Sequence, residues 1–382
     1  RRHTRCSRDW SSDVCSSDLF VLSGIQYGGH ARHRYVDGDY ARHGSDFQNL
    51  HRNKRSMTLD LKSPQGVEIL KRLVAKADVL VENFRPDVKR RLGIDYENLA
   101  QINPRLVYGS ISGFGQSGPY RDRPGYDQIA QGLGGLMSVT GLPGQGPVRV
   151  GIPIADLTAG IFLAQGILVA LLEREQSGKG QWVHTSLLQA MVTMMDFQAT
   201  RWLMDEVIPP QAGNDHPTGI PTGVFRTSDG HINIAASGQR MFRRLCVALG
   251  IESLADDPRF VEPLDRSRNR QALTAELEKV LQHKESAVWV DLLNSHGVPA
   301  GPILNMKQVF ENEQVQHLGM AVPTEHPELG EIQIQGHPYV LSRTPGAPLT
   351  AAPDLGEHTD QILDELGYST EQISRFRSDQ VV

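Results

Sequence analysis

Asp156 is the residue whose setting in this chain points most directly to chemistry. It lies in the segment Gly151-Ile-Pro-Ile-Ala-Asp-Leu-Thr-Ala-Gly160. An apolar, strand-like stretch precedes it, and a long apolar stretch with the pattern of a helix follows it. An aspartate carboxylate, with its ordinary pKa of about 4, is ionised at neutral pH, so it can attack an activated carbonyl such as a thioester without a neighbouring base. Asp156 could instead cap the helix expected from Leu157 to about Glu175, because Asp often precedes an apolar periodic run. The spacing alone leaves both interpretations open.

From Asn53 onward the chain carries a series of short motifs spread over most of its length. They are Asn53-Lys-Arg-Ser56, Leu59-Asp-Leu-Lys62, Val81-Glu-Asn-Phe-Arg-Pro86, Asn103-Pro-Arg-Leu106, Pro124-Gly-Tyr-Asp127, the Asp156 segment, Ser177-Gly-Lys-Gly-Gln-Trp182, Gly223-Val-Phe-Arg-Thr227, Asp256-Asp-Pro-Arg-Phe260, Gly297-Val-Pro-Ala-Gly-Pro302 and Leu355-Gly-Glu-His358. Each motif is short, but in number and order they resemble the family III coenzyme A transferases, the group that includes formyl-CoA and carnitine CoA transferases.

The resemblance implies a covalent role for Asp156. In that family the matching residue attacks an acyl-CoA thioester to give a mixed anhydride, the released thiolate then forms an aspartyl-CoA thioester, and a free carboxylic acid finally takes the coenzyme A. Acyl-CoA and small carboxylic acids are therefore the expected partners, with no prosthetic group and no metal. Family members form intertwined homodimers, so a homodimer is expected. Donors for the developing oxyanion are expected among the backbone N–H groups of Gly219 to Gly223.

The same resemblance points to residues that would hold coenzyme A. Cations suit its phosphates, backbone and amide groups can hold the adenine edge, and an aromatic ring can cover an apolar part. Without the family, Lys62 and Arg91 would be interpreted as solvated helix charges. The expected contacts are Leu59, Lys62, Asn83, Phe84 and Arg91.

Tyr126 and Asp127 distinguish the leading hypothesis from its nearest rival. In transferases of this family the matching positions line the substrate pocket beside the nucleophile, where a tyrosine hydroxyl could hydrogen-bond a carboxylate. Related α-methylacyl-CoA racemases need two proton carriers and are expected to have a histidine where this chain has Tyr126. A racemase is thus the second hypothesis, and an inactive CoA-binding remnant is the third. A half-buried structural tyrosine stays open for Tyr126.

Composition and charge argue against several other classes. The net charge of -5 and the pI near 6.3 do not indicate the clustered basic surface that nucleic-acid binding needs. No uninterrupted apolar run approaches the about 18 residues of a membrane span, and Leu157 to Leu172, which polar residues interrupt, is expected to be a buried core helix. Cys6, Cys15 and Cys246 lack metal-ligand spacing, which fits a reducing cytoplasm.

One glycine-rich segment has a pattern that is typical of a different class of enzyme. Gly113-Phe-Gly-Gln-Ser-Gly118 has the glycine pattern of a dinucleotide-binding loop and follows a predicted strand. Such a loop should open a helix and be followed by an acidic residue, but Pro119 and Pro124 come next and the region around Ser138 has no carboxylate. A nicotinamide dehydrogenase is therefore disfavoured.

The elements that must position these residues alternate between helices and strands. Val67–Val74 has a helical pattern and precedes the short apolar run Asp78–Val81, and Leu106–Ile111 has the pattern of a further strand. Repeated alternation predicts an α/β fold with a Rossmann-like, doubly wound parallel sheet. A helix is expected to run through Met195 and Met204, with its methionines in the core.

Composition also predicts how the chain divides, since 382 residues exceed the usual size of a single core. Pro209–Gly219, rich in proline and glycine, marks a change of domain. Beyond it, two strand-like runs flank Asp229-Gly230, a strong hairpin signal, and helices are expected at 239–249, 269–282 and 287–296. The predicted divisions are a non-native or disordered segment at 1–19, the N-terminal part of a large CoA-binding domain, expected to be truncated at its start, at 20–204, a small α+β domain at 205–305, and a return to the large domain at 306–382.

Overall fold

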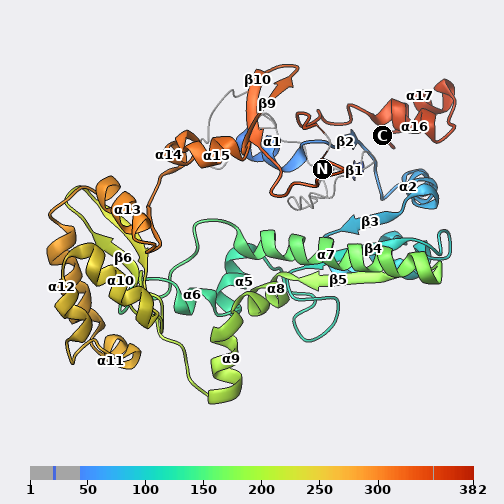
Figure 1. The fold of residues 1–382 in the computed structure, drawn as a ribbon. Coiled ribbons are helices and arrows are strands. Elements are labelled where there is room, and N and C mark those ends of the chain that lie inside the picture. Colours follow the sequence, from blue (N-terminus) through green and yellow to red (C-terminus); the bar gives the residue numbers. More distant parts are fainter. Residues whose placement is uncertain (1–19, 23–43, 347) are drawn as a thin grey trace. The chain divides into compact units, whose positions relative to one another are not determined.

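The computed structural model describes residues 20–22, 44–346 and 348–382 (Figure 1). The segment 1–19, for which the sequence predicts non-native or disordered chain, lies outside these residues. The described residues divide into two compact units, the first formed by those within 1–136, 150–200 and 313–382, and the second by 137–149 and 201–312. Each unit has its own core and is described by itself.

The first unit contains most of the helices and all the parallel strands. In chain order its elements are β1 (Phe20–Leu22), α1 (Ser45–His51), β2 (Arg55–Met57), α2 (Pro64–Lys76), β3 (Val79–Glu82), α3 (Pro86–Leu92), α4 (Tyr96–Leu99), β4 (Val107–Ser112), α5 (Asp127–Leu133), α7 (Ile154–Ser177), β5 (Trp182–Ser186), α8 (Leu187–Met194), α15 (Glu313–His317), β9 (Ala321–His326), β10 (Gly330–Gln335), α16 (Thr359–Glu365) and α17 (Thr370–Ser378). The short α6 (Leu136–Val139) and α9 (Asp196–Asp205) cross the boundaries between the units.

A three-stranded parallel sheet, ordered β3-β4-β5, forms the centre of the first unit (Figure 1). In its register, Tyr108 of β4 pairs with Leu80 of β3 and with Trp182 of β5. Residues 107–111 of β4 are all buried, as expected for a parallel strand covered on both faces. The predicted α/β class with a parallel sheet is therefore confirmed.

Different helices cover the two faces of this sheet. On one face Val107 and Ile111 pack with α7, and on the other Tyr108 packs with residues of α2 and α4. Gly109 lets α7 approach, because a Cβ atom there would lie 3.0 Å from Cδ1 of Ile167. Both sides of β4 are thus closed by helix, which leaves the ends of the strands to carry a site.

Helix α7 starts earlier and is less buried than the sequence predicts. It begins at Ile154 rather than Leu157, and its buried stripe of Ala155, Ala159, Leu163, Ile167 and Ala170 packs in the core. The opposite side is exposed: Ile161 is 65% and Leu172 is 71% exposed. The prediction of a buried core helix therefore holds for one face of α7 and is wrong for the other, because a helix that is apolar all round still offers only one face to the sheet.

By length and hydropathy alone, α7 could cross a membrane. A helix that packs one face on a sheet passes the same test, so this property by itself does not indicate a membrane protein.

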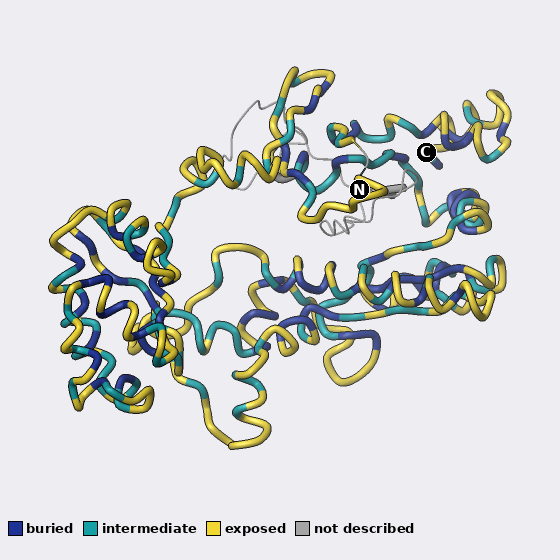
Figure 2. Tube along the Cα trace, in the orientation of Figure 1, coloured by how far each residue is buried: buried dark blue, intermediate teal, exposed yellow. Residues whose placement is uncertain are grey.

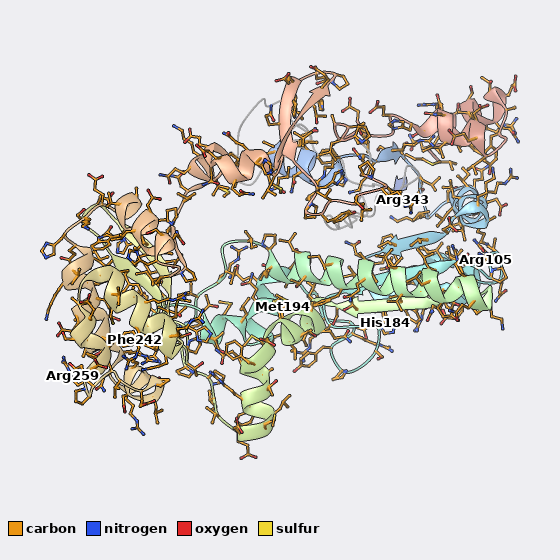
Figure 3. All side chains as sticks on the ribbon, viewed as in Figure 1. Arg105, His184, Met194, Phe242, Arg259 and Arg343 are labelled. Carbon is orange, nitrogen blue, oxygen red and sulfur yellow. The ribbon has the colours of Figure 1, made fainter. Side chains whose placement is uncertain are left out.

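The predicted helix through Met204 is broken in two. Helix α8 ends at Met194 and α9 begins at Asp196, whose φ of 44° departs from helical backbone. Met191 is buried, but Met194 and Met204 are 46% and 75% exposed, so the prediction that all these methionines fill the core is wrong (Figure 3). Figure 2 shows that α9 is exposed along most of its length.

The C-terminal segment packs on elements near the start of the described chain. Residues of α16 and α17 share a core with Met57 and Ile69. The backbone N–H of Asp60 donates to the carbonyl of Val381 at 2.8 Å, and Arg55 pairs with Glu365 at 2.9 Å. The described chain after residue 312 thus belongs to the first unit.

The second unit is built around a three-stranded antiparallel sheet, ordered β6-β7-β8. The predicted hairpin around Asp229-Gly230 is confirmed, since Phe225 pairs with Ile232 in the antiparallel register. Phe242 lies in the core that the sheet shares with its helices (Figure 3). The elements are β6 (Thr222–Arg226), β7 (His231–Ala235), α10 (Gln239–Leu249), the 3-10 helix η1 (Glu252–Asp256), α11 (Pro263–Arg268), α12 (Arg270–Leu281), α13 (Ser286–Ser295), β8 (Ala300–Pro302) and α14 (Met306–Glu311).

Candidate functional site

Asp156 lies within the first turn of α7, half-buried and not at its cap. The N-cap position belongs to Pro153, three residues earlier, so Asp156 does not occupy the position of a capping residue. A carboxylate in the first turn is stabilised by the positive end of the helix dipole. The structure thus places a carboxylate in the first turn of α7, a helix whose buried stripe packs on the central sheet.

Asp127 and Gln131 of α5 hold the segment that leads into α7. Asp127 Oδ1 accepts a hydrogen bond from the backbone N–H of Ala155 at 2.9 Å, and Oδ2 accepts one from Gln131 Nε2 at 2.8 Å. Gln131 Oε1 in turn accepts from the N–H of Val150 at 3.0 Å, and its Nε2 donates to the carbonyl of Ile152 at 3.3 Å. Both side chains are buried. Two polar groups on one helix therefore fix the backbone on the N-terminal side of Asp156.

The two residues predicted for the substrate pocket have different surroundings. Tyr126 is 59% exposed at the N-cap position of α5, so it is not a half-buried structural tyrosine. Asp127 is buried, with its carboxylate bonded to backbone and amide donors. The sequence pattern did not single out Gln131; its spacing of four residues from Asp127, on one face of a helix, was the available signal.

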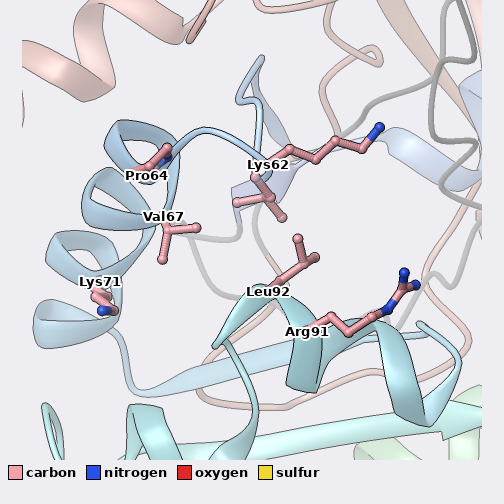
Figure 4. Close-up of a pocket in the computed structure, with 7 residues that line it drawn as sticks. Lys62, Pro64, Val67, Lys71, Arg91 and Leu92 are labelled. Atoms are coloured by element: carbon pink, nitrogen blue, oxygen red, sulfur yellow. The ribbon is translucent and has the colours of Figure 1, made fainter.

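A pocket of about 480 Å³ in the first unit brings together two of the predicted CoA contacts, Lys62 and Arg91. In Figure 4 these two side chains extend toward the same side of the pocket. Lys71 of α2 adds a third cation that sequence reasoning missed, and Arg91 also pairs with Asp87 at 3.3 Å. The lining residues are Leu61, Lys62, Pro64, Val67, Lys71, Arg91 and Leu92. Three cations around an apolar wall suit a ligand that carries phosphates and an apolar part.

The other three predicted contacts do not line this pocket. Leu59 is partly buried against two of the hydrophobic cores. Asn83 and Phe84 form the turn between β3 and α3, where the Phe84 ring packs against the core under α2 and α4. The backbone N–H of Phe84 donates to Glu82 Oε2 at 2.7 Å.

Burial shifts the titration of groups near the carboxyl end of the sheet. The pKa of Glu82 is raised, because loss of hydration outweighs the stabilising ammonium of Lys89, 2.6 Å away. Partial desolvation of the ring and the same ammonium lower the pKa of His184 on β5 (Figure 3). Shifts of this kind cluster at functional sites, although buried ion pairs of purely structural value cause them too.

The predicted oxyanion donors, Gly219 to Gly223, lie in the second unit. The N–H groups of Thr218 and Gly219 donate to His216 Nδ1, at 3.2 and 2.8 Å. The N–H of Gly219 is therefore already bonded within this segment. In the part of the chain that the structure describes, no group of three His, Cys, Asp or Glu side chains is placed to hold a metal ion.

Comparison with known proteins agrees with this arrangement. The model of CoA-transferase family III matches residues 28–359. A succinate–glutarate CoA-transferase from Agrobacterium fabrum is 39% identical over 82% of this chain and 79% of its own. An acetyl-CoA:oxalate CoA-transferase from Acetobacter aceti is also 39% identical, over 79% of this chain and 78% of its own.

A solved structure shows the same likeness. The crystal structure of a CAIB/BAIF family protein from Brucella suis superposes with a TM-score of 0.73 at 38% identity, covering 84% of this chain and 83% of that one. With a family match that spans most of the chain, this protein belongs to CoA-transferase family III and is a transferase.

Proposed function

We propose that this CoA-transferase moves coenzyme A from an acyl-CoA to a free carboxylic acid, with Asp156 as the covalent nucleophile. The observation that carries the proposal is the place of Asp156 in the first turn of α7, beyond a backbone segment that Asp127 and Gln131 fix. A nucleophile held on a rigid element attacks with little loss of entropy, which is a large part of catalytic power.

The chemistry proceeds by two exchanges on the same carboxylate. The Asp156 carboxylate attacks the thioester carbonyl and expels the CoA thiolate, which leaves a mixed anhydride. The thiolate attacks the aspartyl carbonyl, releases the donor acid and forms an aspartyl-CoA thioester. The acceptor carboxylate then attacks this thioester, and the thiolate takes the acceptor acyl group, which restores the Asp156 carboxylate. One thioester replaces another, so no additional energy source is required.

We place the phosphates of coenzyme A at Lys62, Lys71 and Arg91. The support is that these cations line one pocket of the first unit. The turn Asn83–Phe84, together with Leu59, is proposed to contact the adenine and the apolar parts of the ligand. Arg91 lies in the last turn of the short helix α3, and the Asn83–Phe84 turn comes just before the same helix, which links the two groups of contacts.

We propose short dicarboxylic acids as acceptors and small acyl-CoA thioesters as donors. The support comes from the names of relatives, which act on succinate and glutarate or on acetyl-CoA and oxalate. A screen of carboxylates against succinyl-CoA and acetyl-CoA tests this, and transfer only to monocarboxylates would overturn it.

We further propose a cytoplasmic homodimer. The exposed apolar side chains of α9, among them Trp202, Leu203 and Met204, and those on the outer face of α7 suit coverage by a second copy of the chain. Light scattering coupled to gel filtration tests the assembly, and a monomer at micromolar concentration would refute it.

The decisive experiment replaces Asp156 by Ala in the full chain. Transfer is expected to fall by at least about a thousandfold, because the covalent route is lost, while CoA binding is retained. Hydroxylamine added during turnover should modify Asp156 in the wild type, as read by mass spectrometry of the peptide that contains it. Asp291, an exposed residue of α13, provides the matched control, and D291A should behave as the wild type. Undiminished transfer by D156A would end the proposal. Exchange of the α-proton of a 2-methylacyl-CoA in deuterated water, without an acceptor acid, would favour a racemase instead.

A further inference from the structure

A buried lysine stands at the carboxyl end of the central sheet. Lys89 of α3 has a side chain only 3% exposed, and its Nζ donates to Glu82 Oε1 at 2.6 Å, Gln116 Oε1 at 2.6 Å and Ser110 Oγ at 3.1 Å. The ammonium also lies 5.1 Å from the centroid of the Trp182 ring. All three donors of the ammonium are thus used, and strands β3, β4 and β5 each contribute a residue around it.

The acceptors of Lys89 are themselves bonded to the loops that follow β3 and β4. Glu82 Oε2 accepts the backbone N–H of Phe84 at 2.7 Å. Gln116 Nε2 donates to Ser112 Oγ at 3.3 Å, and the same hydroxyl accepts the backbone N–H of Gly115 at 3.1 Å. One charged group therefore connects the Asn83–Phe84 turn to the loop that carries Gln116.

Lys89 and Arg91 belong to the same helix but have opposite surroundings. The side chain of Arg91 is 70% exposed and lines the cationic pocket, whereas Lys89 is buried beneath the sheet end. Burying an ammonium is costly unless it is paired and fully hydrogen-bonded, so an apolar side chain would be the simpler choice for packing alone. Glu82 and Ser112 are the last residues of β3 and β4, so part of this network lies at the carboxyl edge of the sheet, where α/β folds bind their ligands.

We propose that Lys89 is a positioning residue for coenzyme A, and this rests on the proposed function. It anchors α3 from its buried side, so that the exposed Arg91 and the Asn83–Phe84 turn before the helix keep the spacing that the ligand requires. Lys89 does not touch the ligand itself. Its effect is therefore expected on the binding of coenzyme A and not on that of the acceptor acid.

The test compares K89M, Q116M and the matched control K279M in the full chain. Lys279 forms an exposed pair with Glu276 at 2.9 Å, so K279M removes a lysine charge at the surface of α12. K89M is expected to raise the Kd for free CoA, measured by calorimetry, and the KM for acyl-CoA about tenfold, while the KM for the acceptor acid stays within about twofold. Q116M, which leaves the Lys89–Glu82 pair in place, should show a smaller change in the same direction.

Hydrogen exchange gives a readout that does not depend on activity. The amides of Phe84 and Gly115 should exchange faster in K89M than in the wild type, and Q116M should affect Gly115 more than Phe84. If K89M is too unstable to study, Q116M alone carries the test. Wild-type affinity for CoA in folded K89M or Q116M, with both amides protected, would overturn the positioning role and leave the proposed function intact. Failure of the wild type to bind CoA would overturn both.

Discussion

The carboxylate of Asp127 accepts a hydrogen bond from the backbone N–H of Ala155 at 2.9 Å, across 28 residues of sequence. Ala155 precedes the proposed nucleophile directly, so Asp127 acts on the position of Asp156 through the backbone. An N–H in the first turn of a helix has no partner within the helix, and the carboxylate supplies one. The residue predicted to line a substrate pocket thus has a bonded role in placing the neighbouring helix.

This relationship predicts that D127A slows the chemical step more than it weakens substrate binding. Losing hydrogen bonds to a charged group costs about 1.5–3 kcal/mol, and kcat is expected to fall about 10- to 100-fold, while the KM for acyl-CoA stays within about twofold. Steady-state kinetics measures both constants. D122A, at an exposed position in the loop before α5, is the control and should keep wild-type kcat. Wild-type kcat in D127A would contradict the role assigned to this contact.

Elements set by local pattern could be predicted from the sequence. The hairpin around Asp229-Gly230 follows from turn chemistry, and β4 follows from the strand pattern of Leu106–Ile111, since both signals lie within a few residues. Helix α10 was predicted with the bounds that it has, because Gly250, with φ of 69°, ends it.

Features that depend on distant partners could not be predicted. Nothing near Asp127 in the sequence shows that its carboxylate binds the N–H of Ala155, because that contact exists only after α5 and α7 pack. The exposed side of α7 has the same cause: periodicity identifies apolar residues but not which of them a neighbour covers. Lys89 belongs to the same class, since a charged residue in a short helix gives no sign that it is buried.

The pocket of three cations predicts a measurable role for Lys71, which the sequence did not single out. K71M is expected to weaken CoA binding about two- to fivefold, the size expected for one partly exposed charge that acts on an anionic ligand. The loss should shrink at high salt, because screening weakens the contribution of the charge in the wild type. Calorimetry with free CoA at two sodium chloride concentrations checks both points. K76M removes a charge from the same helix outside the pocket, and an equal loss in K76M would argue against a specific contact.

Arg266 is predicted to be essential for the stability of the second unit. The side chain is fully buried and donates to the carbonyls of Ile220 and Phe260, at 3.1 and 2.9 Å, and to Gln239 Oε1 at 2.9 Å. R266M leaves these acceptors unsatisfied and should lower the free energy of unfolding by roughly 3–5 kcal/mol. R268M, at a side chain 68% exposed on the same helix, should change it by less than about 0.5 kcal/mol. Urea unfolding followed by circular dichroism compares the two, and equal midpoints would refute the prediction.

Asp229 is predicted to make the stability of the second unit depend on pH in the acid range. It accepts hydrogen bonds from the backbone N–H and the hydroxyl of Ser286, both at 2.8 Å, and from the Thr227 hydroxyl at 3.0 Å. These bonds lower its pKa in the folded protein. The carboxylate therefore stabilises the fold above its ordinary pKa of about 4, and this contribution is lost as the pH falls through the lower folded value. D229N keeps a residue suited to the turn but removes the charge. The urea midpoints of the wild type and D229N should therefore differ most at pH 7, and the difference should shrink as the pH falls below about 4. A difference that persists unchanged at pH 3, beyond that of the surface control D291N, would show that the charge of Asp229 does not act through these bonds.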